Sequence, residues 1–100
     1  GIQGILQNNC TLFPHALAQG STFNPALIQR MTEAAGEEAK VIGIHQILSP
    51  VLDIARELRW GRVEETFGED PYLISEMGIR KTASPVCRSI LLRTALLPAD

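Results

Sequence analysis

The chain has 100 residues, of which 45% are hydrophobic, enough for one small core. Its formal net charge of -2 excludes a generally basic surface for nucleic acid. No stretch approaches the ~20 consecutive apolar residues of a membrane-spanning helix, so we expect no membrane-spanning segment. The first residues lack the pattern of a signal peptide. Because the chain starts with Gly rather than Met, this absence leaves the compartment open.

The charges are unevenly distributed along the chain. Residues 1–78 hold five Lys or Arg and ten Asp or Glu, a net charge of -5. Residues 79–100 hold four Lys or Arg and one Asp, a net charge of +3. This reversal of sign predicts a boundary near Gly78.

The residues that most often bind metals or form crosslinks are isolated in this sequence. Cys10 and Cys87 form no CxxC pattern, so we interpret them as free thiols rather than as a disulfide or a metal pair. His15 and His45 lack the spacing of metal ligands. The sequence therefore predicts no metal site.

Two helices are predicted in the first half of the chain. A short one covers residues 15–20, and a longer one covers residues 24–42. Asn24 is a good N-cap of the longer helix, and Pro25 suits its first position. Positions spaced by three and four form a stripe in which only one member is charged: Leu27, Ile28, Met31, Ala34, Ala35, Glu38 and Ile42. Gly43 supplies the left-handed residue that commonly ends a helix.

A short buried strand is predicted over residues 44–49, which are rich in Ile and Leu and are followed by Pro50. A helix, a glycine and a buried strand form an αβ unit of a parallel sheet, so the fold class is predicted to be α/β. The polar loop that follows lies at the carboxyl end of this strand, where α/β folds bind ligands. A further helix begins at Pro71 and is capped by Asp70. Beyond Gly78 no clear pattern continues.

The polar loop at residues 59–72 holds two arginines and three of the five aromatic residues. Arg62 offers five donors in a fixed fork, which can grip vicinal hydroxyls, a carboxylate or a phosphate, or can brace the loop internally. We interpret Arg59 as a brace and Trp60 as loop packing rather than as a sugar platform. The loop also carries four carboxylates: Glu64, Glu65, Glu69 and Asp70.

These carboxylates have two interpretations. They can hold the loop in place as ion-pair partners of the arginines, which we favour. Alternatively, two of them can act as the acid and the nucleophile or base of glycoside cleavage. Closeness in sequence supports this second interpretation poorly, because such pairs usually come from different strands.

Six motifs follow one another along the chain: Phe-Pro at 13–14, Ser-Thr-Phe-Asn-Pro at 21–25, Gly-Glu-Glu-Ala at 36–39, Ser-Pro-Val-Leu-Asp at 49–53, Trp-Gly-Arg at 60–62 and Phe-Gly-Glu-Asp-Pro-Tyr at 67–72. In this order they resemble the N-terminal barrel domain of glycoside hydrolase family 3, the β-glucosidases and β-xylosidases. Each motif is weak alone, but the ordered set is specific. The resemblance covers residues 1–78.

The resemblance implies a partial (β/α)8, TIM-barrel-like segment, incomplete alone because a full barrel takes about 250 residues. It implies a retaining, exo-acting enzyme that hydrolyses terminal β-linked glucose or xylose through a covalent glycosyl-enzyme, without a cofactor. The partner is then a small β-linked oligosaccharide or glycoside, and the parent enzyme is periplasmic or secreted. Arg62 matches the family's arginine that donates to hydroxyls of the first sugar, and is the one substrate-binding residue that we predict.

The sequence departs from the family in ways that bear on catalysis. It lacks the Ser-Asp-Trp-like motif of the nucleophile, the Lys-His pair that grips the same sugar and the acid/base carboxylate. We therefore predict that no catalytic residue lies within this chain and that the chain alone is inactive. The alternative is a noncatalytic sugar-binding or inactive truncated fragment. Residues 79–100 do not match the family, and we hypothesise that they are a frameshifted or foreign tail.

Overall fold

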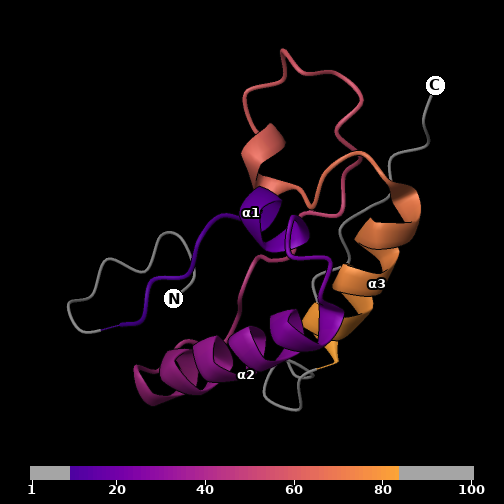
Figure 1. Cartoon of the computed structure of the whole chain (residues 1–100). Helices are drawn as coiled ribbons and strands as arrows, with labels where there is room; N and C mark the ends of the chain where they lie inside the picture. Colours follow the sequence, from indigo (N-terminus) through magenta and orange to yellow (C-terminus); the bar gives the residue numbers. More distant parts are fainter. Residues whose placement is uncertain (1–9, 84–100) are drawn as a thin grey trace.

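The structure is a computed structural model in which residues 10–83 are described. Within this range lie the helices α1 (Ala16–Gly20), α2 (Pro25–Val41) and α3 (Pro71–Thr82) and the short 3-10 helix η1 (Val63–Glu65). α2 packs against α3, while α1 contacts both η1 and α3 (Figure 1). The loop that precedes η1 extends away from the three α-helices.

The two predicted helices of the first half are confirmed. α1 begins one residue later than predicted, at Ala16. α2 begins at Pro25, where the Asn24 side chain accepts a hydrogen bond from the backbone N–H of Leu27 at 3.1 Å. The chain leaves α2 through Gly43, whose φ of 82° lies in the left-handed region that favours glycine.

Glu38 is the charged member of the apolar stripe, and its partner explains its position. The backbone N–H of Thr11 donates to both oxygens of its carboxylate, at 3.2 and 3.0 Å, and the Thr11 hydroxyl donates as well. These hydrogen bonds hold the pKa of Glu38 below its usual value. The carboxylate therefore ties the segment before α1 to the last turns of α2.

The helix predicted from Pro71 is also confirmed. The Asp70 side chain caps it by accepting from the backbone N–H of Tyr72 at 3.0 Å. α3 then continues past Gly78 to Thr82, where the Thr82 hydroxyl donates to the carbonyl of Gly78 at 2.9 Å. The boundary at residue 78 and the foreign tail at residues 79–100 stay predictions, and residues 84–100 lie outside the described part. Sequencing the locus in independent samples checks the tail, and an intact, recurring frame would contradict it.

The core joins α2, α3 and the end of the polar loop. Its buried side chains are Ile28, Phe67, Ile74 and Met77. Partly buried apolar side chains pack around them: Ala16, Met31, Leu52, Ile54 and Leu73. Phe67 is the only loop residue in the buried group, so the loop is anchored to the helices through its ring.

The strand predicted over residues 44–49, and with it the α/β class, is not confirmed, because the described part of the chain contains helices and no strand. A strand exists only when a neighbouring strand accepts and donates its backbone hydrogen bonds, and no second strand is present between residues 10 and 83. Ile47 is buried, at 9% exposure, between the exposed residues Gln46 and Leu48. The segment thus has residue types that favour a strand, without the partner that a strand requires.

Gly20 provides the first testable prediction, because it lies against the backbone of Phe67. A Cβ at this position would come within 2.5 Å of the Phe67 carbonyl oxygen. Since this neighbour is backbone, we expect Gly20→Ala to lower the free energy of unfolding by about 1–3 kcal/mol. Urea denaturation followed by circular dichroism measures the change.

Gly78→Ala is the matched control. The Cβ of an alanine at position 78 would meet the flexible Leu52 side chain, at 2.8 Å, rather than backbone. Leu52 can rotate away, and alanine favours a helix interior over glycine by up to ~1 kcal/mol. We therefore expect Gly78→Ala to be close to neutral. Equal losses in the two variants would contradict the close packing of α1 on the loop.

Candidate functional site

The polar loop is held on a tight turn at η1. The backbone N–H of Glu65 donates to the Arg62 carbonyl at 3.1 Å, and Val63 accepts from the N–H and the hydroxyl of Thr66, at 3.0 and 2.7 Å. The Thr66 hydroxyl, fully buried, also accepts from the N–H of Gly68 at 3.2 Å. Because Thr66 adjoins the buried ring of Phe67, the turn is fixed to the core.

This turn brings Arg62 and Glu65 together in a two-point ion pair. The Nε of Arg62 donates to one carboxylate oxygen at 2.8 Å, and Nη2 donates to the other at 2.7 Å. The pair raises the pKa of Arg62 and lowers the pKa of Glu65. The two side chains are 62% and 36% exposed, so the pair lies at the surface of the described part of the chain.

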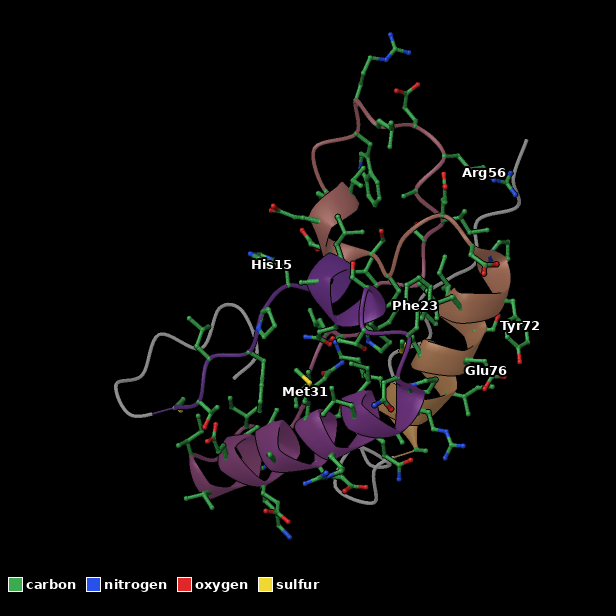
Figure 2. All side chains as sticks on the ribbon, viewed as in Figure 1. His15, Phe23, Met31, Arg56, Tyr72 and Glu76 are labelled. Atoms are coloured by element: carbon green, nitrogen blue, oxygen red, sulfur yellow. The ribbon has the colours of Figure 1, made fainter. Side chains whose placement is uncertain are left out.

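Two further ionisable groups, from distant parts of the sequence, act on this pair through their charges. The charge of Asp53 adds to the increase in the pKa of Arg62, and the charge of His15 adds to the decrease in the pKa of Glu65. Figure 2 shows His15 at the start of α1, the helix that contacts η1. From the sequence, His15 was interpreted only as a possible metal ligand, and Asp53 appeared only within the motif at residues 49–53. Their effect on the Arg62–Glu65 pair depends on packing between segments, for which no local sequence signal exists.

The other charged residues of the loop have separate roles. Arg59 pairs with Glu57 at 2.8 Å, and this pair lowers the pKa of Glu57 to about 2. Asp70 caps α3, as described above. Glu64 and Glu69 are exposed and form no ion pair with another residue in the range 10–83. Of the four loop carboxylates, Glu65 is therefore the one that braces Arg62.

Between residues 10 and 83 no three His, Cys, Asp or Glu side chains gather in a way that would hold a metal ion. Cys10 is a free thiol, while Cys87 lies outside the described residues. Among α1, α2 and α3, no helix has the length and apolar character to cross a membrane.

Comparison with known sequences identifies relatives among the glycosidases. The profile of the glycosyl hydrolase family 3 N-terminal domain matches residues 1–84. A β-xylosidase of Formosa agariphila is 47% identical over 72 residues, which make up 71% of this chain and 10% of the relative. A periplasmic β-glucosidase of Salmonella typhimurium is 36% identical over 74 residues, 74% of this chain and 10% of that enzyme.

A solved structure supports the same relationship. The structure of a β-glucosidase involved in saponin metabolism from intestinal bacteria is similar, with a TM-score of 0.71 and 44% sequence identity. The similarity covers 72% of this chain and 9% of that protein. The chain thus spans about a tenth of the length of the relatives that it matches. With a family profile that matches most of its length, this chain belongs to glycosyl hydrolase family 3.

Proposed function

We propose that this chain is part of a retaining, exo-acting β-glycosidase that removes terminal β-linked glucose or xylose. The proposal is supported by membership of the family and by relatives named β-xylosidase and β-glucosidase. Within the chain, one observation carries the proposal: only one edge of the Arg62 guanidinium is hydrogen-bonded, to Glu65, and the other edge is left to donate to a ligand. The other proposed part is structural: residues 44–49 would form a barrel strand once neighbouring strands from the rest of the domain are present.

Arg62 is suited to bind neutral hydroxyls. Glu65 occupies Nε and the inner N–H of Nη2, whereas the outer edge formed by Nη1 and Nη2 donates to no acceptor within residues 10–83. This outer edge holds two parallel donors on a side chain that is 62% exposed. Two neighbouring hydroxyl oxygens of a terminal sugar fit such a pair of donors. In this proposal Arg62 binds and orients the sugar.

In this proposal the bond-breaking groups come from residues outside the described part of the chain, because the family's nucleophile and acid/base motifs are missing from the sequence. Retaining hydrolysis needs a carboxylate that attacks the anomeric carbon and a carboxylic acid about 5 Å away that protonates the leaving oxygen. The first step forms a glycosyl-enzyme, and water then attacks it while the second group accepts a proton. Glu65 is engaged by Arg62 and Asp70 by the N-terminus of α3, so neither is available for this chemistry.

The 100-residue chain alone is therefore expected to hydrolyse no aryl β-glucoside or β-xyloside above the buffer rate. The measurement is release of the coloured phenol by purified chain, with an intact family 3 β-glucosidase as the positive control. Turnover that copurifies with the chain and disappears in Glu65→Gln or Asp70→Asn would contradict the proposal, because it would place a catalytic carboxylate in this loop.

The proposed function itself is tested in a chimera, in which residues 10–83 replace the matching stretch of the β-glucosidase from intestinal bacteria. We call this protein the glucosidase chimera. Because the two sequences are 44% identical, we expect the chimera to fold and to hydrolyse an aryl β-glucoside. A folded chimera without activity, as judged by circular dichroism and thermal denaturation, would contradict the assignment of this loop to a sugar site.

A further inference from the structure

We propose that Glu65 is a positioning and specificity residue, which fixes the direction of the Arg62 fork and cancels its charge so that the site prefers neutral sugars over sugars that carry a carboxylate. This inference rests on the proposed role of Arg62 in sugar binding. It goes further because it assigns the selectivity to a residue that is not itself expected to contact the sugar.

The rigidity of the turn supports this role of Glu65. Arg62 and Glu65 stand at the two ends of one 3-10 turn, which is closed by the hydrogen bond from the Glu65 N–H to the Arg62 carbonyl at 3.1 Å. The next residue, Thr66, is fully buried and bonded to Val63. The backbone therefore fixes the spacing between the two charged side chains, and Glu65 reaches Arg62 from a support anchored in the core.

The geometry of the Arg62–Glu65 pair also supports this role. A guanidinium held at Nε and Nη2 by two nearly parallel hydrogen bonds, of 2.8 and 2.7 Å, has little freedom to rotate in its own plane. Its outer edge then points away from Glu65 in one defined direction. An arginine without this partner on an exposed loop would sample many rotamers and would lose side-chain entropy on binding a sugar.

Local charge also supports this role. Glu65 cancels the formal charge of Arg62, and the negative charge of Asp53 also acts on Arg62 and helps to raise its pKa. Glu64, on the same turn, is exposed and forms no ion pair with residues 10–83, so solvent screens its charge. The charge of His15, the residue before α1, helps to lower the pKa of Glu65. A carboxylate on the sugar would meet the negative charges of Glu65 and Asp53, whereas hydroxyl groups need only donors. These negative charges would repel a sugar that carries a carboxylate, and many binding sites achieve specificity by such repulsion.

The test uses Glu65→Gln, Glu65→Asp and Glu64→Gln in the glucosidase chimera. For each variant we would measure kcat/KM on an aryl β-glucoside and the inhibition constants of glucose and of glucuronate, which differ at one carbon. We expect Glu65→Gln to lower kcat/KM by about tenfold. We also expect the ratio of the two inhibition constants, the inhibition ratio, to shift by about tenfold in favour of glucuronate. Each tenfold change corresponds to the loss of one charge-assisted contact of ~1.4 kcal/mol.

The other two variants separate position from charge. Glu65→Asp keeps the charge but shortens the side chain, so we expect a lower kcat/KM with an unchanged inhibition ratio. Glu64→Gln removes the same charge one residue away without touching Arg62, so we expect both quantities to stay within about twofold of the parent. A ratio that is unchanged in Glu65→Gln, or that moves equally in Glu64→Gln, would overturn the inference.

The same series distinguishes failure of this inference from failure of the proposed function. If Arg62→Ala leaves kcat/KM unchanged, the sugar-binding role of Arg62 fails. If Arg62→Ala lowers it and Glu65→Gln changes neither quantity, the role of Glu65 alone fails.

A second measurement uses the 100-residue chain itself and needs no activity. Because the ion pair lowers the pKa of Glu65, the carboxylate stays charged, and the pair intact, below the ordinary value of 4.5. The NMR signal of the Arg62 Nε–H should therefore shift only as the pH falls below this value, and should be displaced at all pH values in Glu65→Gln. An Arg62 signal that is identical in parent and Glu65→Gln would overturn the pairing on which the inference depends.

Discussion

Phe67→Ala is expected to remove most of the stability of the folded chain. The ring is 2% exposed and is the largest fully buried side chain in the described part. It contacts the buried side chains of both long helices, and the Lys81 ammonium lies 5.3 Å from its centroid. Truncating a buried Phe to Ala costs about 3–5 kcal/mol. This is comparable to the whole stability expected of so small a unit, at ~0.05–0.15 kcal/mol per residue.

The measurement is urea denaturation of the 100-residue chain followed by helical circular dichroism. Phe23→Ala is the matched control, because the same atoms are removed from a side chain that is 74% exposed. Its φ of 49° is as unusual for alanine as for phenylalanine, so the backbone contribution should largely cancel. We expect the control to retain its transition midpoint. Similar losses in both variants would show that Phe67 is not the anchor between the loop and the helices.

Arg62→Ala is expected to lower kcat/KM of the glucosidase chimera by about 100-fold. A hydrogen bond to a charged group contributes about 1.5–3 kcal/mol, or about 10- to 150-fold in rate, and here two such bonds would be lost together. The substitution also leaves Glu65 without its partner, which places an uncompensated carboxylate beside the sugar. Initial rates on an aryl β-glucoside, at concentrations well below KM, give the change directly.

Arg59→Ala is the matched control for this prediction. Arg59 lies in the same loop, also pairs with a glutamate, and is 90% exposed. Its loss removes the same charge without the proposed sugar contact, so we expect kcat/KM to stay within about twofold. If Arg59→Ala and Arg62→Ala lower activity equally, the effect belongs to loop charge and not to a contact with the sugar. Thermal denaturation of each variant checks that the fold is retained.

The helices were predictable because their signals are local. Asn24 with Pro25, and Asp70 with Pro71, are cap pairs that act within one turn, and each begins its helix as predicted. The strand predicted at residues 44–49 is not formed, because a strand depends on contacts that are not local. Its residue types favour a strand, but the hydrogen bonds that define one must come from a second strand, which the described residues lack. Propensity is a weaker guide where the partner lies elsewhere in sequence.

The candidate site was predictable only in part. Composition indicated that the loop arginines would pair with loop carboxylates, but four candidates were present. Which of them pairs with Arg62 depends on η1, whose geometry selects Glu65 and leaves Glu64 exposed. His15 acts on the pair through packing of α1 against η1, and Asp53 acts on it from the segment before the loop, which no spacing in the sequence encodes. The sugar-binding role of Arg62 came from the resemblance and stays a prediction.

The central claim is that Arg62 donates hydrogen bonds to hydroxyls of the terminal sugar. The most direct test is a double-mutant-type cycle in the glucosidase chimera. One change is Arg62→Ala, the other is the removal of a single hydroxyl from the aryl β-glucoside, and kcat/KM is measured for each combination. If Arg62 contacts a given hydroxyl, the parent chimera loses kcat/KM when that hydroxyl is removed, whereas Arg62→Ala loses little more. The account predicts such coupling for two adjacent hydroxyls. Strictly additive losses at every hydroxyl would contradict it.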